Sequence, residues 1–165
     1  MSSFLPILEK FECEGISYII VGGLAVVLHG KARLTTDVDF IVALDQENCL
    51  KVIKVLSDLT YYPRIPVNPK DFADPQIRSA WIKEKGLTVM SFYSNANPLI
   101  GVDLFVECPT NYDDMLKRAV YKELGEIKVR VAAINDIIDL KRISGRPKDI
   151  DDIKDLELIL NEGSD

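Results

Sequence analysis

Two aspartates separated by one residue begin an apolar segment, Asp37-Val38-Asp39-Phe40. Successive side chains of a β-strand alternate between faces, so both carboxylates would point the same way while Val38 and Phe40 turn towards a core. Like charges this close on a strand repel each other, and aspartate is disfavoured in strands. A pair of divalent cations would relieve the repulsion, because carboxylate oxygens can bridge two ions. A solvated edge strand is the alternative interpretation.

A third aspartate, Asp103, lies inside the apolar run Val102–Val106, which predicts an interior strand. An unpaired carboxylate in such a strand would be strongly unfavourable or would be neutralised. Either a metal shared with Asp37 and Asp39 or a structural salt bridge must therefore compensate its charge. If the three carboxylates cluster, their repulsion should raise the pKa of at least one of them or recruit a cation such as Lys141 or Arg33.

A pair of glycines, Gly22-Gly23, joins a predicted buried strand to a predicted helix. Glycine lets the backbone approach a ligand closely, and the free N–H groups at the start of a helix attract anions. The turn therefore predicts a phosphate-binding site, although glycine at this position also permits tight packing. Lys31 and Arg33 follow the helix and either contact phosphates or lie on a solvated loop. His29, the only histidine in the chain, is expected to cap or pack the helix end.

Apolar periodicity and turn residues predict the elements that position these groups. Strands are expected at Tyr18–Val21, Asp37–Val42, Leu87–Tyr93, Val102–Val106 and Ile127–Val131. Helices are expected from about Phe4 to Gly15 and at Leu24–His29, Gln46–Leu59, Gln76–Lys85, Asp113–Ala119, Ile134–Ile143 and Lys148–Leu160, with an irregular loop at Thr60–Asp74. Asp45 should cap the third helix, and Gly86 and Gly145 should end two others.

These elements predict an α+β fold, a small mixed sheet flanked by helices, with a short helical C-terminus over about 133–161 and a single domain over 1–165. A chain of 165 residues with 47% hydrophobic residues can form a substantial core. Three separated cysteines favour reduced thiols and a cytoplasmic location. The sequence shows neither the pattern of a signal peptide nor an apolar run near about 18 residues, so no membrane association is expected.

The net charge of −6 argues against a protein that holds long nucleic-acid duplexes by counterion release. It does not argue against an RNA end or a nucleotide at a metal-lined pocket, because bound divalent cations invert the local field.

Taken together, the motifs resemble the signature of the DNA polymerase β-like nucleotidyltransferase superfamily. Val21-Gly22-Gly23, a spacer of thirteen residues and Asp37-Val38-Asp39-Phe40 match its first motif, and Val102-Asp103-Leu104 resembles the later strand with the third carboxylate. The run from Gly22 to Phe40 is similar to the bacterial and archaeal branch that includes the AbiEii-type toxin nucleotidyltransferases. Lys141 followed by Arg146–Asp152 resembles that branch's last motif.

This resemblance implies the nucleotidyltransferase fold and a Mg²⁺-dependent transfer of a nucleoside monophosphate from an NTP, such as ATP, to a hydroxyl group. Asp37 and Asp39 would ligate two Mg²⁺ ions, and Asp103 would complete one site and help to deprotonate the acceptor. The Gly22-Gly23 turn would bind the triphosphate through backbone N–H groups, since Gly23 stands where many members carry serine.

The resemblance leaves the acceptor open among RNA (tRNA included), protein and small molecules. It also allows a toxin–antitoxin role with an antitoxin partner. A non-catalytic module that binds a nucleotide or a partner protein is the alternative, and the intact aspartate triad favours the enzyme.

The charged tail allows two interpretations. Acidic residues suit the first turn of a helix, and Lys148–Asp152 has the i,i+4 spacing of an ion pair. Alternatively, Lys141, Arg146 and Lys148 contact the NTP phosphates or the acceptor. The resemblance favours this second role for Lys141, which with Arg33 completes the predicted nucleotide-binding set.

Overall fold

The computed structural model describes residues 2–163 and is built on a mixed sheet of seven strands in the order β3-β4-β5-β2-β1-β7-β6. The strands are β1 (Tyr18–Val21), β2 (Asp37–Val42), β3 (Tyr62–Pro63), β4 (Val89–Tyr93), β5 (Gly101–Phe105), β6 (Val120–Leu124) and β7 (Ile127–Val131). β2 runs parallel to β5 and antiparallel to β1, and β1 runs parallel to β7. This arrangement confirms the predicted mixed sheet.

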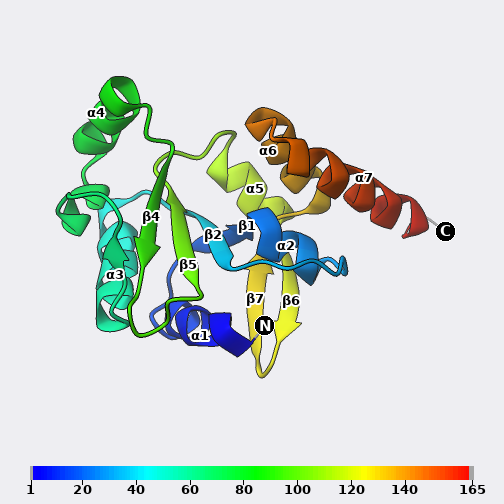
Figure 1. Ribbon diagram of the computed structural model, residues 1–165, viewed down its shortest axis with the longest axis horizontal. Helices are drawn as coiled ribbons and strands as arrows, with labels where there is room; N and C mark the ends of the chain where they lie inside the picture. The colour runs from blue at the N-terminus through cyan, green and yellow to red at the C-terminus, as the bar shows by residue number, and fades with distance from the viewer. Residues whose placement is uncertain (1, 164–165) are drawn as a thin grey trace.

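Helices connect and cover the strands. They are α1 (Leu5–Cys13), α2 (Gly22–Leu28), α3 (Gln46–Asp58), α4 (Pro75–Lys85), α5 (Tyr112–Arg118), α6 (Ile134–Ser144) and α7 (Pro147–Glu162), with 3-10 turns η1 (Ser2–Phe4) and η2 (Pro69–Ala73). Figure 1 shows α6 and α7 at the upper right, away from α1 and α3, which confirms the helical C-terminus. Within residues 2–163, no helix combines the length and apolar character that a membrane span requires.

Local chemistry explains where several helices begin and end. The side chain of Asp45 accepts a hydrogen bond of 2.9 Å from the backbone N–H of Asn48, which caps α3. Gly86 and Gly145 end α4 and α6 with φ angles of 61° and 63°, in the left-handed region that glycine tolerates best. Pro147 occupies the first turn of α7, where no backbone donor is needed. All four residues confirm the predicted boundaries.

An aromatic cluster fixes which way the central strands face. The ring of Phe40 in β2 lies 4.8 Å from that of Phe11 in α1 and 5.6 Å from that of Tyr18 in β1. Val38 is fully buried on the same face of β2. Since alternate residues face opposite ways, Asp37 and Asp39 must lie on the other face of the sheet, as predicted.

Two strands were missed by the sequence analysis. β6 forms a hairpin with β7 and lies at the edge of the sheet, where Lys122 and Glu123 interrupt its apolar pattern. β3 has only two residues, one of them Pro63, and it lies at the opposite edge within the expected loop. Proline is confined to such edges, and short edge strands carry too little periodicity to be recognised.

Candidate active site

The register of the strands places the predicted acidic residues side by side. Asp39 of β2 is the strand partner of Asp103 in β5, and Asp103 is in turn the partner of Ser91 in β4. Paired residues project from the same face of a sheet, and Asp37 lies two residues before Asp39 on that face. All three aspartates therefore share the face opposite the aromatic cluster.

Two glycines make room for these carboxylates. A Cβ atom on Gly22 would collide with the carboxylate of Asp39, and one on Gly101 would collide with the carboxylate of Asp37. Gly22 also has a φ angle of 65°, which other residues adopt only with strain. The turn after β1 thus presents bare backbone to Asp39.

Asp37, Asp39 and Asp103, here called the acidic row, carry unfavourable electrostatics. Burial raises the pKa of Asp39 to about 6, and repulsion from Asp103 and Asp37 adds to it, although Arg146 and Lys141 oppose the shift. Burial also raises the pKa of Asp103, against a hydrogen bond from the hydroxyl of Ser91. The expected repulsion within the cluster is therefore present.

The donor atoms of the acidic row are of the kind that a hard divalent cation prefers. It offers carboxylate oxygens alone, and a cation would relieve the repulsion that raises the two pKa values. In the conformation described for residues 2–163, no three acidic, cysteine or histidine side chains already converge into a complete chelating group.

A buried ion-pair cluster joins the helical tail to the loop before β2. The Nζ atom of Lys141 in α6 lies 2.6 Å from Oδ2 of Asp152 and 3.2 Å from Oδ1 of Asp149, both in α7. Arg33, from the loop, also pairs with Asp152, and Nε of Arg146 lies 3.1 Å from Oδ2 of Asp149. Lys141, Asp149 and Asp152 are all buried.

The cluster corrects part of the helix interpretation of the tail. Asp152 pairs with Lys141 and Arg33, and among the ion pairs of residues 2–163 none joins it to Lys148. The two cations predicted to bind nucleotide are thus already engaged by carboxylates of α7.

Two cavities adjoin the acidic row. The smaller one, here called the polar pocket, has a volume of about 220 Å³. It is lined by Gly23, Arg33, Leu34, Thr35, Thr36, Asp37, Asp39, Asp103, Lys141, Arg146, Lys148 and Asp149. All the predicted site residues except Gly22 therefore line one pocket.

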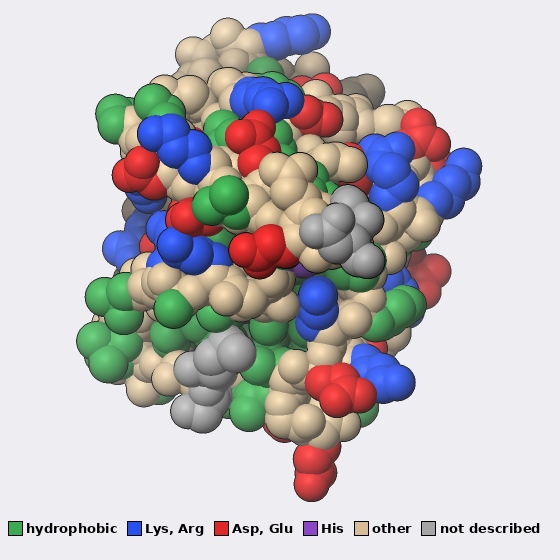
Figure 2. Space-filling model, turned by 90° about the vertical axis from the view of Figure 1, so that its right-hand side faces the viewer, with side chains coloured by type: hydrophobic (Ala, Val, Ile, Leu, Met, Phe, Trp, Pro, Cys, Tyr) green, Lys and Arg blue, Asp and Glu red, His purple; other side chains and the backbone are tan. Residues whose placement is uncertain are grey.

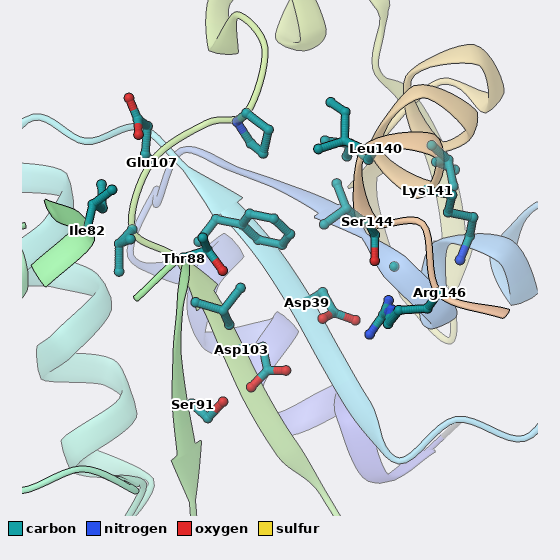
Figure 3. A pocket seen from close by; sticks show the side chains of 18 residues that line it. Asp39, Ile82, Thr88, Ser91, Asp103, Glu107, Leu140, Lys141, Ser144 and Arg146 are labelled. Atoms are coloured by element: carbon teal, nitrogen blue, oxygen red, sulfur yellow. The ribbon is translucent and has the colours of Figure 1, made fainter. Parts of the chain in front are cut away.

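The larger cavity, here called the apolar cleft, has a volume of about 610 Å³. It is lined by Val21, Gly22, Asp39, Ile82, Thr88, Val89, Ser91, Asp103, Phe105, Val106, Glu107, Pro109, Ile137, Leu140, Lys141, Ile143, Ser144 and Arg146. In Figure 3, Asp39, Asp103 and Arg146 lie at one end of the cleft, with Leu140 and Ser144 of α6 on one side and Ile82 and Glu107 on the other. Asp39, Asp103, Lys141 and Arg146 line both cavities, whereas Asp37 lines the polar pocket alone.

Two residues near the motif lie outside the cavities. Nζ of Lys31 pairs with Asp155 of α7 at 2.9 Å, so this lysine belongs to the surface of the tail. Nε2 of His29 lies 2.8 Å from the carbonyl oxygen of Ala132, at the end of α2. This contact confirms His29 as a packing residue.

Sequence reasoning missed Ser91 and Thr35. Ser91 interrupts the buried residues of β4, but only the pairing of β4 with β5 brings it to Asp103. The Thr35 hydroxyl lies 2.9 Å from the place where a Cβ atom on Gly23 would be, and it donates to the carbonyl oxygen of Asp37. Its polar side chain within a loop gave no signal in the sequence.

Solved structures with the same architecture are nucleotidyltransferases. A lincosamide antibiotic adenylyltransferase, LnuA, bound to lincomycin has 20% identity and a TM-score of 0.63, covering 96% of this chain and 97% of its own. ANT(2″)-Ia in complex with adenylyl-2″-tobramycin has 14% identity and a TM-score of 0.64, over 96% and 88%. A putative nucleotidyltransferase from Thermotoga maritima has 16% identity and a TM-score of 0.57, over 94% and 89%. These matches define the fold as that of nucleotidyltransferases.

The family follows from the sequence of the chain. Residues 7–162 match the family described as nucleotidyltransferase of unknown function (DUF6036), and the chain belongs to this family of enzymes. No curated protein sequence matches it.

The fit between Gly22 and Asp39 predicts an unequal cost for two alanine substitutions. Gly15 and Gly22 have φ angles of 62° and 65°, but an added Cβ meets nothing within 4 Å at Gly15. We expect Gly15→Ala to lower the free energy of unfolding by roughly 1 kcal/mol, and Gly22→Ala to lower it by roughly 2–3 kcal/mol, because it adds a collision to the backbone strain. Urea denaturation measures both values, and equal costs would contradict the close approach.

The buried cluster predicts a pH-dependent contribution from Asp149. Burial alone would raise the pKa of this carboxyl, but hydrogen bonds from Arg146, Ser144 and Lys141 outweigh it and lower the pKa to about 2. A lowered pKa stabilises the fold above the unfolded value of about 4, and the benefit disappears as the pH falls from about 4 to about 2.

We therefore expect Asp149→Asn to be less stable than the native protein by about 1–2 kcal/mol near pH 7, and the two to converge towards about pH 2. Asp139→Asn, which removes an exposed pair with Arg142, is the control and should change stability by less than about 0.5 kcal/mol. Urea denaturation across the pH range tests this, and a difference between Asp149→Asn and the native protein that stays constant down to about pH 2 would contradict it.

Proposed function

We propose that this enzyme transfers a nucleoside monophosphate from an NTP, such as ATP, to a hydroxyl group in a Mg²⁺-dependent reaction. The observation that carries the proposal is the strand register that pairs Asp39 with Asp103 and sets Asp37 on the same face. Membership of a nucleotidyltransferase family supports the class of reaction.

The acidic row would hold the metal. Asp37 and Asp39 are the proposed ligands of two Mg²⁺ ions, and Asp103 is the proposed additional ligand of one. When bound, the ions would neutralise charge on the reacting phosphate. The register supports this assignment because it gathers the carboxylates on one face, and a divalent cation would relieve the repulsion that adds to the raised pKa of Asp39.

The polar pocket would hold the β- and γ-phosphates. Arg33, Arg146 and Lys148 line it, and Gly23 adds backbone without a side chain. A guanidinium has five N–H donors, so Arg33 can pair with Asp152 and still donate to a phosphate oxygen. Lys141, whose ammonium already contacts Asp149 and Asp152, completes the proposed set through its remaining donor.

The transfer itself would be mainly a matter of positioning and charge. A bond forms between the acceptor oxygen and the α-phosphorus as the bond from that phosphorus to the β-phosphate oxygen breaks, and pyrophosphate leaves. The acceptor proton passes to a carboxylate, for which Asp103 is the proposed group. Its place at the boundary of both cavities supports that role.

Two classes of acceptor are supported by different observations. The resemblance to the AbiEii-type toxin branch supports a tRNA or protein acceptor, with an antitoxin as partner. The two adenylyltransferase structures, whose complexes contain lincomycin and adenylyl-2″-tobramycin, support a small molecule.

Pyrophosphate release tests the proposed function directly. With Mg²⁺ and ATP, we expect the native protein to bind the nucleotide and to release pyrophosphate, slowly when water is the acceptor. Asp103→Asn should lower the release by roughly 100-fold or more, since it removes both a ligand charge and a proton acceptor. If the protein bound nucleotide but released no pyrophosphate from any of the nucleoside triphosphates tested, the result would instead favour a non-catalytic binding module.

Magnesium should stabilise the fold through the aspartates. Mass action predicts a gain of about 2.7 kcal/mol at one hundred times Kd for an ion that binds only the folded state. Replacing Asp37, Asp39 and Asp103 together with Asn removes their repulsion and most of the ligand charge. We expect this triple variant to melt at least as high as the native protein in EDTA, yet to gain nothing from Mg²⁺. Equal gains for both proteins in a thermal melt would place the ion elsewhere.

Gly23→Val should weaken nucleotide binding and leave the fold intact. A side chain at this position would displace Thr35 and approach the guanidinium of Arg33, both of which line the polar pocket. These neighbours are side chains and can move, so the cost in stability should be small. Isothermal titration with ATP and Mg²⁺ should show roughly a tenfold or greater loss of affinity, equivalent to about 1.4 kcal/mol. Unchanged affinity would show that this turn does not hold the phosphates.

A further inference from the structure

We propose that the apolar cleft is the acceptor site, and that the acceptor is a neutral or cationic small molecule with an apolar body and a hydroxyl group. The inference rests on the proposed function, because it assigns a ligand class to the second cavity of the same site.

The positions of the two cavities support a site in which the polar pocket binds the phosphates and the apolar cleft binds the acceptor. Phosphoryl-type transfer places the attacking and leaving oxygens roughly in line across the phosphorus. With the leaving pyrophosphate in the polar pocket, the acceptor must approach the acidic row from its other side. The apolar cleft opens there, since it shares Asp39 and Asp103 with the polar pocket and extends away from them (Figure 3).

The size and walls of the cleft fit a small molecule. Its volume of about 610 Å³ falls within the range of roughly 300–1,000 Å³ that is usual for such sites. The apolar walls come from three elements of the fold: Ile82 lies in α4, Phe105 in β5, and Leu140 and Ile143 in α6. Ser91 adds a hydroxyl beside Asp103, where it can orient a polar substituent near the reacting centre.

The charges of the cleft disfavour a polyanion. Among residues 2–163, the cationic residues that line the cleft are Lys141 and Arg146, and both also line the polar pocket. Glu107 is exposed at the far side. Beyond those two cations, an RNA acceptor would meet apolar walls and a carboxylate, which offer nothing to its phosphates. Figure 2 shows acidic and basic side chains interspersed on the face of the molecule that lies at the right-hand side of Figure 1.

A binding experiment can test the ligand class without turnover. The probe is n-hexyl β-D-glucopyranoside, which is neutral and combines an apolar chain with hydroxyl groups, and the comparison ligand is a short single-stranded oligoribonucleotide. Isoleucine methyl NMR spectra are recorded with and without Mg²⁺ and α,β-methylene-ATP. We expect the glucoside to shift the methyl signals of Ile82 and Ile143 in a saturable way, and to do so with the nucleotide analogue bound.

Ile143 and Ile150 provide a matched pair of variants. These residues are 62% and 57% exposed, so neither substitution should unfold the protein, and of the two Ile143 alone lines the cleft. Ile143→Asp should weaken glucoside binding by roughly tenfold, because it removes apolar contact and adds a charge, whereas Ile150→Asp should change it by less than about twofold. Neither variant should alter the affinity for the nucleotide analogue.

Four results would overturn the inference: absence of saturable glucoside binding, equal effects of the two variants, displacement of the glucoside by the nucleotide analogue, or tighter binding of the oligoribonucleotide at the same methyl groups. Displacement by the nucleotide analogue would assign the cleft to the nucleoside. Failure of Mg²⁺-dependent nucleotide binding alone would instead overturn the proposed function, and the glucoside data would still define the ligand class of the cleft.

Discussion

Repulsion among three carboxylates on one face of the sheet is the constraint on which this structure depends. The aromatic cluster on the other face fixes the register of β2, and a shift by one residue would turn Asp39 into the core and Phe40 into the site. Packing on one face thus enforces an unfavourable charge arrangement on the other. Neutral residues at these three positions would make the fold more stable. The clustered charges therefore indicate a function that needs the carboxylates together.

The surrounding elements respond to that charge in different ways. Burial and mutual repulsion raise the pKa of Asp39, and Arg146 and Lys141 oppose the increase. Those cations are themselves balanced by Asp149 and Asp152, and an isolated buried lysine would be costly without such partners. The structural and the functional interpretations of the tail are therefore compatible, since the same ion pairs that secure α7 also hold cations at the edge of the site.

The sequence predicted features that depend on local rules. Strand alternation correctly placed Asp37 and Asp39 on one face, and caps such as Asp45 marked the helix boundaries. It could not find Ser91, whose position beside Asp103 depends on which strand lies next to β5. It also paired Asp152 with the wrong partner, because helical spacing favours Lys148 while tertiary packing brings Lys141 and Arg33. The resemblance supplied the proposed chemistry, which the residues alone left open.

The contact between Arg33 and Asp152 has a consequence for how the molecule is made. The two residues are 119 positions apart, and Asp152 lies in the last helix of the described structure. During synthesis from the N-terminus, the loop before β2 leaves the ribosome long before its carboxylate partner exists. The sheet can form earlier, but the polar pocket acquires its final arrangement of charges only after α7 has emerged. A nascent chain should thus pass through a stage with its acidic row assembled and its basic loop unrestrained.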